Sequence, residues 1–390
     1  MIPAVLPTYA RADVTFERGE GPYLFATDGK RYLDFASGVA VTGLGHCHPH
    51  LVEALTRQAH KVWHTSNLFQ VAGQKTVAQR LIDHSFADTV FFCNSGAEAV
   101  EGAIKLARKY QAETGKGEKY RILACTGSFH GRTLATLAAA GNEKYLKGFG
   151  PPAPGFDHVA FGNLNEMRAK VTKETAAILV EPVQGEGGLA TAPQGYLRGL
   201  REICEEFGLL LVYDEVQCGM GRTGRLFAHE WEGVPPDVLA TAKALGGGFP
   251  VGAFLATERA AVGMTAGTHG STFGGNPLAM AVANAVLDVM LAPGFFAQVE
   301  RVAGMLRERL DAAVAKYPKI FAERRGRGLL TGVKCVVPNT EIVDRLRGAG
   351  LLSVGAGDNV VRLLPPLIIE ERHIDEAMGI IEGVARQWPQ

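Results

Sequence analysis

Residues 209–215 read LLLVYDE, an apolar run that ends in two carboxylates. A short run of this kind, without alternation of apolar and polar residues, is typical of a strand that is buried on both faces of a parallel sheet. Three similar runs precede it and are separated by helical patterns, at 89–94 (TVFFCN), 121–126 (RILACT) and 176–182 (AAILVEP). The alternation predicts an α/β fold with a mostly parallel central sheet and helices on both faces.

The pattern changes to longer helices after Asn276. Apolar stripes over 302–313 and 374–381 predict two helices, and Ala292-Pro293-Gly294 predicts a break before the first. We therefore expect a second, smaller α+β domain. For 390 residues the predicted division is an N-terminal segment at 1–40 that packs with the small domain, a large domain at 41–280 and a small C-terminal domain at 281–390.

The composition argues against several classes of partner. Lys plus Arg and Asp plus Glu each total 40, so the charge balance gives no footprint for nucleic acid or an anionic membrane. The six cysteines are scattered without a C-x-x-C pair, as expected for reduced thiols in a cytoplasmic protein. The N-terminus lacks the pattern of a signal peptide, and no apolar run approaches 18 residues. We expect a cytoplasmic protein.

Two motifs suggest other functions but do not fit them. Residues 219–224 satisfy G-x-G-x-x-G, yet no apolar helical stripe follows, as a dinucleotide-binding loop would require. Residues 45–50 (GHCHPH) contain three histidines and a cysteine. These crowd one short turn, whereas a tetrahedral zinc site normally draws its ligands from two separated pairs. We expect a structural turn there and no metal site.

A candidate anion site follows the strand at 89–94. Ser95 and Glu98 form an S-x-x-E pattern, which predicts a capping box at the start of a helix. A glycine-containing turn between a strand and a helix N-terminus presents free N–H groups and suits a phosphate. A plain capped helix start explains the same residues equally well.

Asp214 and Lys243 are the candidates for chemistry. Asp214 ends the most apolar strand, at the sheet edge where ligands of α/β proteins bind. A buried carboxylate needs a partner, and a pyridinium nitrogen is one. Val216 could then pack on that ring and Gln217 could donate to its phenolic oxygen. Asp214 could instead cap the turn that follows the strand. Lys243 has small, apolar neighbours, which lower a lysine's pKa and make its amine nucleophilic; a lysine that snorkels to the surface is the alternative.

Seven motifs follow one another along the chain: GHCHP (45–49), SGAEA (95–99), SFHGRT (128–133), EPVQGEGG (181–188), DEVQ (214–217), Lys243 and STFGGNP (271–277). In this order they resemble the motifs of the class III pyridoxal-phosphate (PLP) aminotransferases, which have the PLP-dependent transferase fold type I. Each is weak alone, but the ordered set covers nearly the whole chain. The sequence is most similar to the branch that acts on acetylornithine.

The resemblance implies a PLP site in a homodimer. Lys243 would hold PLP as a Schiff base and then shuttle a proton. The other implied cofactor contacts are the turn Ser95-Gly96-Ala97 at the phosphate, Phe129 and Val216 on the ring faces, Asp214 at the ring nitrogen, Gln217 at the phenolic oxygen, and Thr272 at the phosphate of the neighbouring subunit. Relatives usually have Thr where this chain has Ala97, so a hydroxyl contact would be lost and the backbone donor kept.

The resemblance also implies how substrates bind. Arg132, with Ser271 nearby, would hold the substrate carboxylate that lies farther from the reacting amine. Arg362 would take the α-carboxylate of glutamate, and Glu186 would pair with Arg362 while the amine donor is bound. Either arginine could instead belong to a structural salt bridge.

We therefore expect an enzyme of arginine biosynthesis that moves the δ-amino group of N2-acetylornithine to 2-oxoglutarate. Residues 37–41 contain no tyrosine, which relatives acting on ornithine are expected to carry there, so an acylated substrate is favoured. Succinylornithine, N-succinyl-diaminopimelate, ornithine and 4-aminobutyrate stay open. Arg362 with Glu186 argues against a PLP aminomutase, and Lys243 with Asp214 and Arg132 argues against a non-catalytic binding protein.

Overall fold

The computed structural model describes residues 2–388, and its centre is a seven-stranded sheet. The strand order is β4 (Thr89–Cys93), β12 (Gly252–Ala256), β11 (Val238–Thr241), β10 (Leu210–Asp214), β7 (Thr175–Val180), β5 (Arg121–Cys125) and β6 (Phe156–Val159). Strand β12 runs antiparallel to both of its neighbours, and the remaining pairs are parallel. The four strands predicted from apolar runs are β4, β5, β7 and β10, and the mostly parallel sheet is confirmed.

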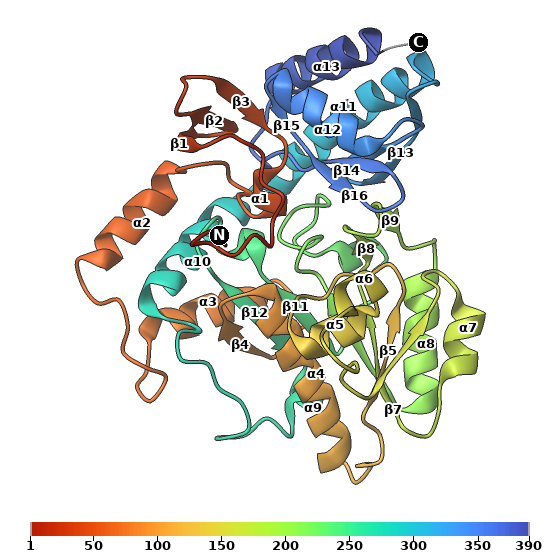
Figure 1. The fold of residues 1–390 in the computed structure, drawn as a ribbon. Helices are drawn as coiled ribbons and strands as arrows, with labels where there is room; N and C mark the ends of the chain where they lie inside the picture. Colours follow the sequence, from red (N-terminus) through yellow and green to blue (C-terminus); the bar gives the residue numbers. More distant parts are fainter. Residues whose placement is uncertain (1, 389–390) are drawn as a thin grey trace.

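Helices cover both faces of this sheet (Figure 1). Helix α4 (Gly96–Glu113) shares an apolar core with Leu210 and Val212 of β10. Helix α8 (Tyr196–Phe207) shares another with Leu211 and Tyr213. Because successive strand residues point to opposite faces, the two helices lie on opposite sides of the sheet. This double burial explains why the sequence of β10 is apolar without alternation.

The C-terminal part forms a smaller α+β unit, as predicted. Its sheet has the order β13 (Phe321–Arg327), β14 (Leu330–Cys335), β17 (Val360–Leu363) and β16 (Val354–Ala356), packed with α11 (Phe295–Lys316), α12 (Asn339–Gly348) and α13 (Glu371–Arg386). Helix α10 (Pro277–Met290) ends just before the predicted break at 292–294. Among the described residues no single helix is long and apolar enough to cross a membrane, and the pair α10 and α11, which together reach that length and composition, is bent by 71°.

The N-terminal strands join the C-terminal part of the chain. Strands β1 (Phe16–Glu20), β2 (Tyr23–Ala26) and β3 (Arg31–Asp34) form one sheet with β15 (Leu351–Leu352), which pairs with β3 in parallel. Figure 1 shows this small sheet, in red, beside the blue C-terminal elements. This pairing supports the predicted packing of the N-terminal segment with the C-terminal part, while the domain boundaries after residues 40 and 280 stay a prediction.

Shorter elements complete the described chain. The helices are α1 (Ser37–Ala40), α2 (Pro49–Ala59), α3 (Ala72–Asp83), α5 (Leu134–Ala140), α6 (Glu143–Leu146), α7 (Leu164–Lys170) and α9 (Glu258–Ala261). Strands β8 (Val183–Gln184) and β9 (Ala190–Thr191) form a two-stranded ribbon, and 3-10 turns lie at Ala228–Trp231 and Lys243–Leu245.

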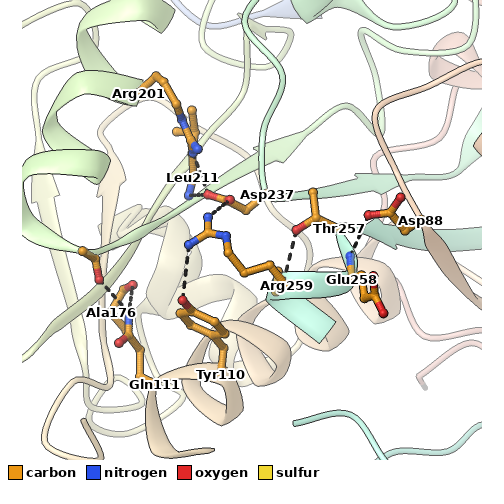
Figure 2. Close-up of polar contacts among 12 residues, drawn as sticks. Asp88, Tyr110, Gln111, Ala176, Arg201, Leu211, Asp237, Thr257, Glu258 and Arg259 are labelled. Carbon is orange, nitrogen blue, oxygen red and sulfur yellow. Dashed lines mark hydrogen bonds and ion pairs between the residues drawn. The ribbon is translucent and has the colours of Figure 1, made fainter. Parts of the chain in front are cut away.

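Buried Asp237 ties together the edge of the large sheet where β10 and β11 begin (Figure 2). Its carboxylate accepts hydrogen bonds from Arg201 of α8 at 2.6 Å and from the Leu211 amide of β10 at 2.8 Å, and it also pairs with Arg259 of α9. This edge lies opposite the one where Asp214 ends β10. One carboxylate therefore fixes two helices and a strand behind the edge that carries the chemistry.

The G-x-G-x-x-G loop at 219–224 and the histidine-rich turn at 45–50 both make contacts within the fold. The 219–224 loop leads into a 3-10 turn, and the buried guanidinium of Arg222 donates to the carbonyls of Leu329 and Pro365, which lie beyond β13 and β17. In the 45–50 turn, the His46 ring pairs with Asp34 at 2.7 Å. Over residues 2–388 no group of three or more His, Cys, Asp or Glu side chains is arranged to hold a metal ion.

Candidate active site

A cavity of about 440 Å³ lies at the carboxyl edge of the large sheet. Its walls come from the segments that follow β4, β5, β7, β10 and β11, together with residues 248–251 and Val41. The crevice outside the carboxyl ends of parallel strands is where ligands of open α/β sheets bind. The predicted site residues that line the cavity are Ser95, Gly96, Ala97, Phe129, Arg132, Asp214, Val216, Gln217 and Lys243.

Lys243 carries a reactive amine. It lies at the start of a 3-10 turn with φ of 49°, a left-handed conformation that costs a non-glycine residue on the order of 1–3 kcal/mol and is found most often at functional sites. Burial, reinforced by the positive charge of Arg362, lowers the pKa of Lys243 from its usual 10.5 to about 8. At neutral pH this amine is therefore neutral far more often than that of an ordinary lysine.

Asp214 is fully buried at the end of β10 and faces into this cavity. Its Oδ1 accepts a hydrogen bond from the Val216 amide at 3.0 Å, and its Oδ2 lies 2.8 Å from Nδ1 of His130. Since a carboxylate only accepts, Nδ1 of His130 carries the proton. Nε2 of His130 is buried without a partner in the described structure. His130 thus orients the carboxylate, a role that its place in the SFHGRT motif did not reveal.

Glu181 is a second buried carboxyl group beside the cavity. It accepts a hydrogen bond from the Phe129 amide at 3.0 Å. Burial, and then the negative charge of Asp214, raise the pKa of Glu181 well above its usual range. The site therefore holds a second buried carboxyl group, one whose protonated form is favoured, and the sequence pointed only to Asp214.

The helix start at Ser95 forms a narrow anion cradle. Ser95 Oγ accepts from the Glu98 amide at 3.2 Å, but Glu98 bonds back to the Asn94 amide, at 2.6 Å, instead of to Ser95, so the predicted capping box is wrong in its second half. The first-turn amides of Gly96 and Ala97 have no acceptor within the helix. A Cβ on Gly96 would lie 2.5 Å from a methyl group of Val216, so only glycine fits there.

Arg362, Glu186 and Gln217 form a connected group, of which Gln217 lines the cavity. The side chain of Arg362 is only 1% exposed, and it donates to Glu186 Oε1 at 2.7 Å and to Gln217 Oε1 at 2.6 Å. Burial opposes ionisation of Glu186, but the charge and hydrogen bond of Arg362, together with Lys243 and Gln217, outweigh burial and lower the pKa of that carboxyl. Gln217 thus contacts both members of the ion pair, since its amide nitrogen also donates to Glu186 Oε1 at 3.5 Å, and the sequence did not predict these contacts.

Arg132 is held differently. Arg132 lines the cavity and is exposed. Its guanidinium carbon lies 3.8 Å from the ring centroid of Tyr145 and 5.5 Å from that of Phe129. No carboxylate within the described residues forms an ion pair with it. The N–H groups of Arg132 are therefore free to bind an anion.

Ser271 and Thr272 lie apart from the other predicted residues. Ser271 lines a separate surface cavity of about 1160 Å³, and its hydroxyl accepts hydrogen bonds from Asn94 at 3.2 Å and from the Gly274 amide at 2.9 Å. Thr272 is exposed and lines neither cavity. Within this single chain, then, Thr272 does not reach the site.

Comparison with known proteins gives consistent matches. Residues 7–384 match the family model described as aminotransferase class-III. The chain is 59% identical over 375 residues to an acetylornithine aminotransferase from Brucella melitensis, covering 96% of this chain and 93% of that protein. It is similar in structure to N-acetylornithine aminotransferase from Stenotrophomonas maltophilia (TM-score 0.85, 38% identity, 97% of each chain). It is also similar to an ornithine aminotransferase from Toxoplasma gondii whose active site is partly occupied by PLP (TM-score 0.93, 33% identity, 98% of this chain and 92% of that one).

Proposed function

Because this chain belongs to the class-III aminotransferases, we propose that it transfers the δ-amino group of N2-acetyl-L-ornithine to 2-oxoglutarate. The products are N-acetyl-L-glutamate 5-semialdehyde and L-glutamate, a step of arginine biosynthesis. The observation that carries amino transfer is the low-pKa amine of Lys243 in one cavity with the buried carboxylate of Asp214. The choice of an acetylated donor rests on the 59% identity to the Brucella enzyme.

The residues of the cavity fit PLP, the cofactor of this family. The free amides of Gly96 and Ala97, beside Ser95, suit its phosphate, and Lys243 supplies the amine that bonds to its aldehyde. The remaining proposed contacts are Asp214 at the ring nitrogen, Phe129 and Val216 on the ring faces and the Gln217 amide hydrogens at the phenolic oxygen. Bound PLP supplies an electron sink that lets an amino group leave one carbon skeleton and enter another.

The chain's own groups move the proton and select the substrates. Lys243, with a pKa of about 8, can accept a proton from the substrate carbon and return it at neutral pH. The free N–H groups of Arg132 bind the α-carboxylate of the acetylated donor. Ser271 lines the separate surface cavity and is linked to the site through its hydrogen bond with Asn94, which lines the site. Arg362 stays paired with Glu186 while that donor is bound, and it accepts the α-carboxylate of glutamate once Glu186 swings away. One site then serves two dissimilar substrates.

We also propose a cytoplasmic homodimer in which Thr272 reaches the phosphate held by the partner subunit. The support is an exposed apolar surface around the 271–274 loop. Phe273 is 61% exposed and packs on His64, while the nearby Asn67 donates to the Ser271 and Gly274 carbonyls. The segment that contains His64 and Asn67 also exposes Trp63, Leu68 and Phe69. Apolar patches of this kind mark protein interfaces.

Separate half-reactions test the function. The purified holoenzyme is mixed with N2-acetylornithine, ornithine, 4-aminobutyrate or glutamate while the visible absorbance of its bound cofactor is followed. We expect N2-acetylornithine and glutamate to bleach the band rapidly and 2-oxoglutarate to restore it. Faster bleaching by ornithine or 4-aminobutyrate would replace the proposed donor. No response to any amine would refute amino transfer itself.

Subunit mixing tests the role of Thr272. Inactive Lys243→Ala subunits are mixed with Thr272→Ala subunits, and hybrids are separated by a tag on one of them. In a hybrid dimer, one site combines Lys243 of the Thr272→Ala subunit with the intact Thr272 of the Lys243→Ala subunit. This site should retain PLP better than the sites of the Thr272→Ala homodimer. Equal retention would contradict the contact across the interface.

A further inference from the structure

Arg132 differs from most arginines of this chain because aromatic rings, and no carboxylate, hold its head group. The rings of Phe129 and Tyr145 stand nearly perpendicular, at 88°, with centroids 6.4 Å apart, and the guanidinium lies against both. The shorter of the two contacts, 3.8 Å, is with Tyr145. An arginine on the face of an aromatic ring is attracted to the ring's electrons without spending its N–H donors.

Tyr145 is itself fixed by local structure. It lies half-buried on the one-turn helix α6, whose start is capped by the Asn142 side chain and preceded by Gly141 in the left-handed conformation. Its amide bonds to the Asn142 carbonyl at 2.9 Å. The Tyr145 hydroxyl forms no hydrogen bond with the described residues. The ring, and not the hydroxyl, is therefore the part of Tyr145 that makes the contact with Arg132.

We infer that Tyr145 is a positioning residue that holds Arg132 ready for the substrate carboxylate, an inference that rests on the proposed function. A carboxylate partner would hold Arg132 equally well but would compete with the substrate for the same N–H groups, whereas a ring does not. The face of Phe129 is assigned to the cofactor, so Tyr145 is the contact that belongs to Arg132 alone. Tyr145 thereby favours amine donors that carry a carboxylate on the carbon bearing the acylamino group.

The test compares two donors that differ only in that carboxylate. These are N2-acetylornithine and N-acetyl-1,4-diaminobutane, and steady-state kinetics are measured with saturating 2-oxoglutarate. For Tyr145→Leu we expect KM for N2-acetylornithine to rise about two- to fivefold, the range of an exposed cation–π contact, with kcat little changed. KM for the donor without the carboxylate should stay the same. Tyr145→Phe keeps the ring and should match the unmodified enzyme for both donors.

Controls separate positioning from a general structural effect. Tyr120→Leu, at a tyrosine outside the cavity, should change neither KM, and each variant is compared by melting temperature and by its visible cofactor absorbance. In an Arg132→Ala background, Tyr145→Leu should have no further effect on N2-acetylornithine, because Tyr145 acts through Arg132.

Three results would overturn the inference: equal losses for the two donors, a loss in Tyr145→Phe as large as in Tyr145→Leu, or an undiminished effect in the Arg132→Ala background. Failure of the proposed function looks different, since the unmodified enzyme would then not accept N2-acetylornithine. In that case the same comparison, made with the best carboxylate-bearing donor and its decarboxylated counterpart, decides the role of Tyr145.

Discussion

Replacing Glu186 with glutamine should shift the enzyme's preference from the acetylated donor towards glutamate. In the described structure Arg362 is almost completely buried, and Glu186 is the only carboxylate paired with it, at 2.7 Å. An incoming α-carboxylate must displace Glu186, so removal of that charge removes the competitor. The acetylated donor, in contrast, then leaves Arg362 without an anion, which is unfavourable for a buried charge.

The size of the shift follows from the burial of the pair. Breaking a desolvated charge pair costs about 2–5 kcal/mol, and the Glu186 side chain is 32% exposed, so the low end applies. About 2 kcal/mol corresponds to a change of roughly 30-fold in the ratio of the two specificity constants. The preference shifts towards glutamate because, in the variant, glutamate no longer has to displace the Glu186 carboxylate from Arg362.

The assay is the pair of half-reactions, each followed by the visible absorbance of the bound cofactor in single-turnover mixing. The ratio of apparent second-order rate constants for glutamate and N2-acetylornithine is compared between the variant and the unmodified enzyme. Glu206→Gln, in an exposed ion pair with Arg168, is the matched control and should leave the ratio unchanged. An unchanged ratio in Glu186→Gln, or a shift towards N2-acetylornithine, would refute the displacement argument.

Three further predictions concern chemistry and stability. Because only the neutral amine attacks an aldehyde, PLP uptake by the cofactor-free protein should speed up as pH rises through about 8 and then level off; a rise that continues towards 10.5 would contradict the pKa of Lys243. Asp237→Ala should lower the free energy of unfolding by about 3 kcal/mol, measured by urea titration, because it strands charges at the sheet edge; a change below 1 kcal/mol would show that solvent replaces its contacts. Gly102→Ala should cost about 1–3 kcal/mol in the same titration, since its Cβ would lie 2.2 Å from the Phe254 ring, and an unchanged midpoint would mean that the ring moves aside freely.

Strand positions could be predicted well wherever burial made the sequence apolar on both faces. Strand β10 is an example, because its alternate residues enter two different cores and none needs to be polar. The direction of β12 could not be predicted in this way. Its segment Gly252–Ala256 is as apolar as the parallel strands of the sheet, and it runs antiparallel to β11, to which it is connected through the Lys243 turn.

Site residues could be predicted where the neighbouring sequence alone indicated their chemistry. They were missed where the role of the residue depends on a partner that is distant in the sequence. Asp214 and Lys243 have recognisable local surroundings. His130 and Glu181 become informative only once β5, β7 and β10 bring them beside Asp214, because a histidine or a glutamate after a strand has many possible partners. Tyr145 is further removed, since its contact with Arg132 depends on how α6 folds back over α5.

The two arginines of the site show why one cavity can serve two unlike substrates. Arg362 is buried, and a buried charge needs an anion, so in the proposed cycle it exchanges Glu186 for a substrate carboxylate. Arg132 is exposed on one side, where water solvates it, and the faces of Tyr145 and Phe129 keep it in place without an internal anion. In this proposal Arg362 becomes available to a substrate only when Glu186 leaves it, whereas Arg132 is available at all times. A donor that binds only Arg132 leaves the Arg362–Glu186 pair intact, whereas glutamate separates it, so in this proposal the difference in burial lets one site bind two unlike substrates in different ways.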